Sequence, residues 1–150
     1  MNCHIAYAAF RDIPDWMDFV SLVIDGFPCL DAASHLEQVK QYIAQKGALV
    51  MQDGTTIIGA AAFSVQTGSI DFFAVHPQYR QYGIAKAFLD FLLCYVFAGQ
   101  EISITTFRQG DKADTGQRAA YQRLGFAEAE LLTEFGYPTQ RLVLPAGQQS

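Results

Sequence analysis

Residues 75–85 read Val75-His76-Pro77-Gln78-Tyr79-Arg80-Gln81-Tyr82-Gly83-Ile84-Ala85. An apolar strand ends here, a polar turn follows, and a helix opens directly after a glycine. The first N–H groups of a helix have no acceptor within it and the helix dipole adds partial positive charge, so this turn can hold a diphosphate without a lysine. A glycine also suits a tight turn that binds nothing. The segment alone leaves both interpretations open.

A helix follows this segment, because apolar residues recur every three or four positions from Ile84 to Tyr95 and Gly99 can end it. Downstream, β-branched and aromatic residues indicate strands, and glycines mark their ends. The predicted elements are a strand over 102–107, a polar loop over 108–114, a helix over 115–124, and strands over 126–133 and 140–144 around the turn Glu134-Phe135-Gly136-Tyr137-Pro138.

Three adjacent antiparallel strands are predicted before the segment, over 48–52, 55–65 and 69–75. The turns between them, Asp53-Gly54 and Gln66-Thr67-Gly68, are short enough to join only neighbouring strands.

The chain begins with a predicted strand over 3–10 and two helices. The first helix runs from Pro14 to Gly26, and the second is capped by Asp31 or Ser34 and ended by Gly47. The expected order is β-α-α-β-β-β-α-β-α-β-β in a single domain, 1–150, whose end at 146–150 frays.

Composition excludes several classes of protein. The chain is 51% hydrophobic and 17% charged, which excludes disorder. Ten basic against 15 acidic residues give a net charge of −5, so we expect no nucleic acid partner. Near the N-terminus, the longest apolar run is too short to cross a bilayer, and we expect no membrane partner.

Cysteine and histidine usage indicates a reduced cytoplasmic location and no metal site. Cys3, Cys29 and Cys94 are odd in number and form no C-x-x-C pair. The three histidines are far apart and form no H-x-x-H pair: His4, His35 and His76.

Two motifs carry a resemblance to a known family. Arg80-Gln81-Tyr82-Gly83-Ile84-Ala85 matches the Q/R-x-x-G-x-G/A loop of the GCN5-related N-acetyltransferase (GNAT) family, where this loop seats the pyrophosphate of acetyl-coenzyme A (acetyl-CoA). Ala120-Tyr121-Gln122-Arg123-Leu124-Gly125-Phe126 resembles the family's later Y-x-x-x-G-F helix and turn. The resemblance covers nearly the whole chain. It implies an α/β fold (α+β with a mixed sheet), the GNAT-like acyl-CoA N-acyltransferase fold, with the cofactor between splayed fourth and fifth strands.

The resemblance also implies an activity, the transfer of an acetyl group from acetyl-CoA to a primary amine of a small molecule or peptide. Tyr121, whose ordinary pKa of about 10 keeps it protonated at neutral pH, is expected to be the general acid toward the leaving thiolate. The alternative is an interior tyrosine whose hydroxyl hydrogen-bonds to a neighbouring strand. An N–H near Val75 is expected to stabilise the oxyanion. The residues expected to bind the cofactor are Phe73, Ala74, Val75, Arg80, Gln81, Tyr82, Gly83, Ile84, Ala85 and Asp114. Asp114 stands where many members carry Asn, which leaves its contact with the cofactor open.

The general base and the acceptor site are less defined by the sequence. Asp71, which its apolar neighbours could desolvate in part, and Glu134 are the candidate bases, and a surface acid is the alternative for each. His76 is a further candidate base or a turn residue. Phe27, Arg108 and Tyr137 are the candidate acceptor residues. Arg108 would pair with an acceptor carboxylate or phosphate, or with Asp111. Trp16 and Phe19 would line the amine pocket or the core.

Other functions stay open on this sequence. The same fold can serve as a non-catalytic acyl-CoA-binding or protein-interaction module, and an unrelated α/β protein can hold a nucleotide at a glycine loop. Edge strands near the C-terminus could pair across a homodimer.

Overall fold

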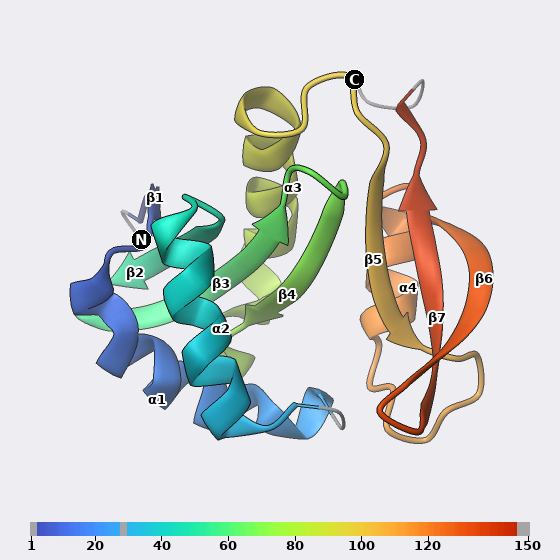
Figure 1. Cartoon of the computed structure of the whole chain (residues 1–150), viewed down its shortest axis with the longest axis horizontal. Coiled ribbons are helices and arrows are strands. Elements are labelled where there is room, and N and C mark those ends of the chain that lie inside the picture. Colours follow the sequence, from blue (N-terminus) through green and yellow to red (C-terminus); the bar gives the residue numbers. More distant parts are fainter. Residues whose placement is uncertain (1–2, 28–29, 147–150) are drawn as a thin grey trace.

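The computed structural model describes residues 3–27 and 30–146, so Cys29 and most of the expected frayed end lie outside the described residues. The described strands form one mixed sheet in the order β1-β2-β3-β4-β5-β7-β6 (Figure 1). The strands are β1 (Ile5–Tyr7), β2 (Ala48–Asp53), β3 (Thr56–Ser64), β4 (Ser69–Val75), β5 (Ile102–Phe107), β6 (Ala127–Glu134) and β7 (Tyr137–Leu144).

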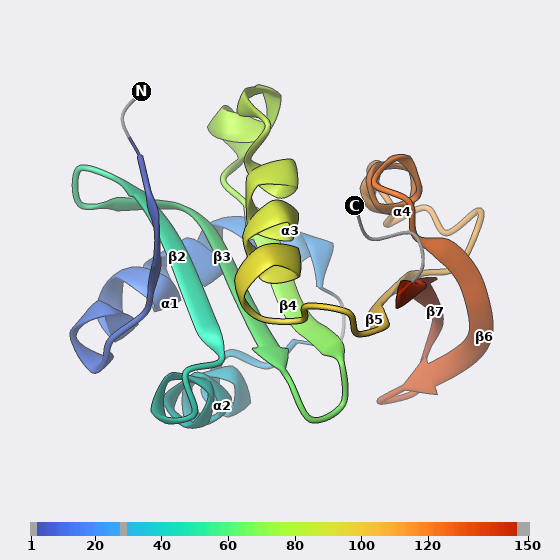
Figure 2. The same cartoon turned by 90° about the horizontal axis from the view of Figure 1, so that it is seen from above.

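Helices cover both faces of the sheet, with α1 and α2 on one face and α3 and α4 on the other (Figure 2). Their bounds are α1 (Ile13–Val23), α2 (Ala32–Ala44), α3 (Ile84–Tyr95) and α4 (Gln117–Arg123). Short 3-10 segments adjoin these helices. η1 (Phe10–Asp12) precedes α1, η2 (Ile24–Gly26) follows α1, and η3 (Pro77–Tyr82) precedes α3. None of the described helices has the length and apolar character needed to cross a bilayer.

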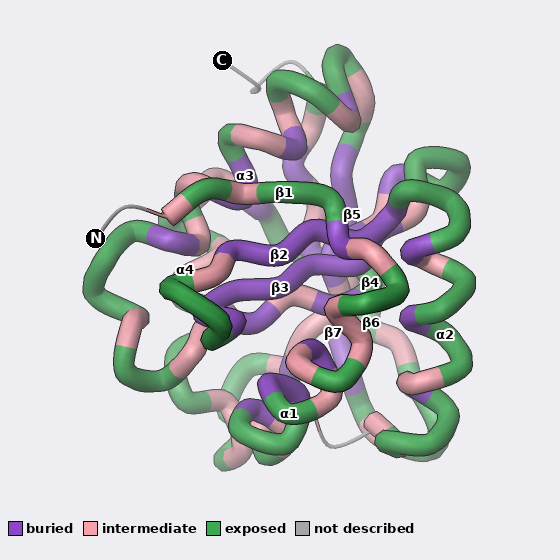
Figure 3. The backbone as a smooth tube through the Cα atoms, turned by 90° about the vertical axis from the view of Figure 1, so that its left-hand side faces the viewer, coloured by how far each residue is buried: buried purple, intermediate pink, exposed green. Residues whose placement is uncertain are grey.

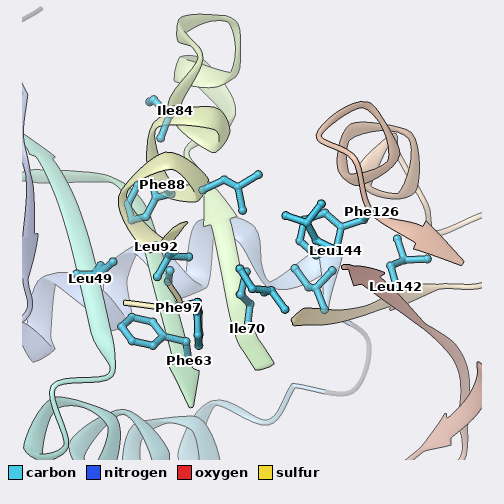
Figure 4. Close-up of a cluster of buried hydrophobic side chains, with 14 of the residues drawn as sticks. Leu49, Phe63, Ile70, Ile84, Phe88, Leu92, Phe97, Phe126, Leu142 and Leu144 are labelled. Atoms are coloured by element: carbon cyan, nitrogen blue, oxygen red, sulfur yellow. The ribbon is translucent and has the colours of Figure 1, made fainter. Parts of the chain in front are cut away.

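Each face of the sheet has its own apolar core. Trp16 and Phe19 of α1 and Val39 of α2 pack on one face. The other core runs from α3 to the C-terminal strands and includes Ile84, Phe88, Leu92, Phe126, Leu142 and Leu144 (Figure 4). Both cores rest on β2 and β3, which are buried along most of their length (Figure 3).

Gly59 sets how closely α3 approaches the sheet. A Cβ at this position would lie 2.8 Å from a ring carbon of Phe88 and 3.0 Å from a methyl carbon of Ile84. Real Cβ atoms do not approach so closely, so the absent side chain lets the first turns of α3 lie directly on β3. This contact fixes the N-terminus of α3 relative to β4.

The predicted order of elements is confirmed, and two strand boundaries are wrong. β1 spans only Ile5–Tyr7, because the chain turns into η1 at Phe10. The last hairpin is tighter than expected: Phe135 and Gly136 both have positive φ, 51° and 80°, and β7 starts at Tyr137. Pro138 is tolerated in β7 because it pairs with Thr133 of β6 and lies beyond the end of the β5 pairing.

The splay between the fourth and fifth strands is confirmed. β4 and β5 are parallel and pair only at Ser69 with Ser103 and Ile70 with Ile104. After this point the two strands diverge (Figure 1). Within the described residues, β4 from Asp71 to Val75 therefore has no strand partner on its β5 side.

Candidate active site

A cleft of about 680 Å³ lies where β4 and β5 part. Its walls come from the start and one face of α2, from β4 and β5, from α4, and from the hairpin between β6 and β7. This volume falls within the range of small-molecule sites in proteins. The lining includes Phe27, Phe73, Asp71, Tyr121, Glu134 and Tyr137, which all come from the set predicted from sequence.

The N-terminus of α3 has the features of an anion site. Gly83 is its N-cap, with φ of 71° and ψ of 25°, and no side chain caps the helix. A Cβ on Gly83 would meet nothing within 4 Å, so the space beside it is open. Arg80, Gln81 and Tyr82 are exposed in η3, whereas the Ile84 side chain is buried in the core. Ile84 can therefore offer a ligand its backbone N–H only.

The backbone of β4 leads from this helix end into the cleft. Phe73, Ala74 and Val75 pair with β3 on one side. Their other side faces the gap left by β5, where N–H and C=O groups can pair with an extended ligand. The ring of Phe73 also packs on Phe88 of α3, with centroids 5.4 Å apart, which fixes β4 against the helix.

Tyr121 lies on α4 and lines the cleft. Burial raises the pKa of its phenol well above the ordinary value, and the carboxylate of Asp114 adds to the shift. Tyr121 is thus protonated at neutral pH. Within the described part of the chain, no side chain or carbonyl hydrogen-bonds its hydroxyl.

Arg118, three residues earlier, is the buried anchor of α4. Its guanidinium donates to the carbonyl of Phe107 and to the Gln140 side chain, both at 2.8 Å, and to Glu128 at 3.1 Å. These bonds attach α4 to β5, β7 and β6 and thereby position Tyr121. The sequence motif did not indicate this role.

Asp114 caps α4. Its Oδ1 accepts hydrogen bonds from the N–H of Gly116 at 3.0 Å and of Gln117 at 2.9 Å. The N-terminus of a helix favours a negative charge, so an aspartate suits this position without any ligand. Its predicted contact with the cofactor stays a prediction.

The candidate bases differ in their surroundings. Asp71 lines the cleft and is exposed. Its Oδ2 accepts a hydrogen bond of 2.6 Å from the hydroxyl of Tyr42, and burial together with this bond raises the pKa of Tyr42. Glu134 ends β6 at the cleft. His76 serves the turn, since its Nδ1 accepts from the N–H of Gln78 at 3.1 Å.

Arg108 does not line the cleft, and its predicted pairing with an acceptor anion is not supported. Its guanidinium donates to the carbonyls of Thr139 at 3.1 Å and Leu132 at 2.8 Å. These bonds join the end of β5 to the β6–β7 hairpin. The alternative partner, Asp111, instead accepts a 2.6 Å bond from the hydroxyl of Tyr137, which lowers the pKa of Asp111.

The aromatic residues predicted for the amine pocket divide between two places. Phe27 lines the cleft and packs on Phe72, with ring centroids 4.9 Å apart. Trp16 and Phe19 are fully buried in the core.

The second predicted helix was expected to take part in acceptor recognition, but its cleft-lining residues were not named as such from sequence. One face of α2 and the residue before it contribute Asp31, Ser34, His35, Gln38 and Tyr42, each three or four positions from another member of the set. That spacing places them on one stripe of a helix, which is the signal that could have found them. The stripe is polar, and it runs beside the apolar stripe that enters the core.

His35 is the buried member of this wall. Its Nε2 accepts a 2.9 Å hydrogen bond from the indole N–H of Trp16. Because an indole nitrogen can only donate, Nε2 carries no proton in this arrangement. Burial lowers the pKa of His35, and the imidazole is neutral.

Within residues 3–27 and 30–146, no group of three or more His, Cys, Asp or Glu side chains is arranged to hold a metal ion.

Known proteins resemble this chain in sequence and in fold. The family described as "Acetyltransferase (GNAT) domain" matches residues 25–137. The chain matches no curated protein sequence.

Three solved structures share the fold at low sequence identity. A GNAT-family protein from Desulfovibrio desulfuricans has 19% identity and a TM-score of 0.75, with 97% of this chain and 99% of that chain covered. YncA from Salmonella typhimurium, solved with its cofactor acetyl-CoA, has 14% identity and a TM-score of 0.70, covering 96% and 94%. The ribosomal-protein-S18-alanine N-acetyltransferase of Escherichia coli has 16% identity and a TM-score of 0.70, covering 97% and 94%.

Proposed function

Because the chain belongs to the GNAT acetyltransferase family, we propose that it transfers the acetyl group of acetyl-CoA to a primary amine of a small molecule or peptide. The observation that carries the proposal is the parting of β4 and β5 after Ile70 and Ile104, which opens the backbone of β4 between the uncapped end of α3 and the cleft. An extended thioester can lie along that backbone and reach the cleft from the α3 side.

Backbone groups do the binding in this proposal. The first N–H groups of α3, next to Gly83, hold the pyrophosphate, and the absence of a side-chain cap leaves them available. Phe73, Ala74 and Val75 hold the pantetheine chain through the β5-facing groups of β4. An N–H near Val75 polarises the thioester carbonyl and stabilises the oxyanion that forms there.

The chemistry is a direct transfer in a ternary complex. The neutral amine attacks the carbonyl carbon and the carbon–sulfur bond breaks. A carboxylate takes the proton that the amine loses, and Asp71 and Glu134 are the two that we propose for this role because both line the cleft. Tyr121 gives its proton to the departing thiolate.

Calorimetric titration with acetyl-CoA, followed by thiol release with a panel of primary amines, tests this function. We expect micromolar binding, thiol release that depends on the amine, and an N-acetylated product by mass spectrometry. Absence of acetyl-CoA binding would refute the proposal at its first step.

A non-catalytic acyl-CoA-binding module is the second candidate function. It is favoured by Asp114, which stands at a position near the cofactor where many members of the family carry Asn. Acetyl-CoA binding without thiol release on any amine would support this alternative.

Location and assembly complete the proposal. We place the enzyme in the cytoplasm, which the free thiols of Cys3 and Cys94 support. A homodimer is supported by β6, which lies at one edge of the sheet and is largely exposed.

A further inference from the structure

Acidic side chains from three separate elements line the cleft. Asp31 lies at the start of α2, Asp71 on β4 and Glu134 at the end of β6, and all three line the cleft. Among the described residues of the lining, none is Lys or Arg. His35 does not supply a positive charge, because its Nε2 already accepts the Trp16 N–H.

The hydrogen-bond partners of two of these carboxylates are neutral. Asp31 accepts from the N–H of Ser34 at 3.0 Å and from its hydroxyl at 2.8 Å. Asp71 accepts from the Tyr42 hydroxyl at 2.6 Å. Neither carboxylate takes part in an ion pair within the described part of the chain. The hydrogen bonds from Ser34 also lower the pKa of Asp31.

The rest of the wall suits a donor of N–H groups. Hydroxyl side chains of β4, β5 and β7 line it, and the Thr139 hydroxyl, in a residue only 6% exposed, has no partner among the described residues. Phe27 and Phe135 add aromatic rings, whose faces attract ammonium groups. A ligand carboxylate or phosphate would meet like charges and find no cation to bind.

We propose that the acceptor is an amine that bears a second positively charged group and no carboxylate or phosphate, as an alkyl diamine does. The inference rests on the proposed function. One amine must be neutral to attack and loses its proton to one carboxylate. Asp31 takes part in no ion pair among the described residues, and a second ammonium group on the same molecule supplies its counter-charge.

Three probes of matched length test the inference: hexamethylenediamine, n-hexylamine and aminocaproate. Their binding to the complex of the protein with coenzyme A is measured by calorimetry, and their acetylation by thiol release. We expect the diamine to bind about fivefold more tightly than hexylamine, as one partly exposed charge pair allows, and aminocaproate to bind most weakly. Added salt should reduce the preference, since screening weakens interactions of exposed charges.

Asp31→Asn gives a matched test, because asparagine also caps helices and the variant should fold. It should lower the ratio of diamine to hexylamine affinity about threefold. Asp18→Asn removes the same charge from an exposed position on α1 outside the cleft, and the ratio should not change.

The outcomes separate this inference from the proposed function. Equal affinities of diamine and hexylamine, or no binding of either, would overturn the inference even if hexylamine were acetylated. Tight binding of the diamine that Asp31→Asn weakens, without acetylation of any probe, would show that the cleft binds a second positive charge but would overturn the proposed transfer and, with it, the diamine as acceptor.

Discussion

Replacing Gly83 with alanine should separate the stability of the α3 N-terminus from its binding of acetyl-CoA. Gly83 has φ of 71°, which alanine adopts at a cost of about 1 to 2 kcal/mol. A Cβ there would meet no protein atom within 4 Å, so no steric clash adds to this cost. Alanine also restricts the unfolded chain, which stabilises the folded protein by about 0.4 to 1 kcal/mol. The net loss of stability is therefore about 1 kcal/mol. For a chain of this size that corresponds to a fall in Tm of about 2 to 4 °C.

Gly99→Ala is the matched control. Gly99 has φ of 73°, a Cβ on it would also meet nothing within 4 Å, and it lies beyond the opposite end of α3. The two variants should therefore lose similar stability. Only Gly83→Ala places a methyl group in the space where the pyrophosphate would lie, and we expect its affinity for acetyl-CoA to fall at least about tenfold.

Thermal unfolding and calorimetric titration of both variants measure the two effects. If Gly83→Ala and Gly99→Ala bind acetyl-CoA equally, the space beside Gly83 is not the pyrophosphate site. If Gly83→Ala loses much more stability than Gly99→Ala, loss of binding no longer identifies a ligand contact.

Three further substitutions test the other parts of the site. Tyr121→Phe should lower kcat about a hundredfold and leave the affinity for acetyl-CoA unchanged, as loss of a general acid predicts; an unchanged kcat at every pH would contradict that role. Asp114→Asn should keep the hydrogen bonds at the start of α4 and bring the pKa of Tyr121 closer to its ordinary value, which absorbance titration of tyrosinate measures. Asp114→Ala should lose these bonds and cost about 1 kcal/mol of stability. Burial lowers the pKa of His35, so below about pH 6.5 its imidazole binds a proton in the unfolded chain but not in the folded one. Stability should therefore fall as pH drops below about 6.5. His35→Gln should reduce this dependence in chemical unfolding, and His4→Gln, at an exposed position, should not.

The elements that sequence predicted best are those whose signal is local. α3 has an unbroken apolar stripe, and the turn at Asp53-Gly54 is made of residues that adopt its conformation readily. The last hairpin was misjudged because Phe135 has φ of 51°, a conformation that sequence patterns assign to glycine or asparagine. The pairing of β7 with β6 holds Phe135 in this turn, and such long-range pairing leaves no local signal.

The candidate site was predicted where a motif marks it and missed where only tertiary packing does. The loop and Tyr121 carry recognisable spacing: the loop directly precedes α3, and Tyr121 lines the cleft. Arg108 was assigned to the acceptor because an arginine in a polar loop suits an anion. Its guanidinium is instead held by the carbonyls of Thr139 and Leu132, whose positions depend on the β6–β7 hairpin.

The polar wall of α2 shows how the acceptor side can be both rigid and variable. Its apolar stripe, with Val39 and Ile43, is buried in the core and fixes the helix on the sheet. On the adjacent stripe, Tyr42 is tied to Asp71 and His35 to Trp16, so the cleft-facing side chains are oriented by hydrogen bonds to β4 and α1. Substitutions of its exposed members, Asp31, Ser34 and Gln38, can therefore change the cleft surface without disturbing the apolar contacts that hold α2. We expect acceptor specificity to vary more readily along this stripe than in β4, whose backbone is proposed to bind the cofactor and whose Phe72 and Ala74 are buried in the core.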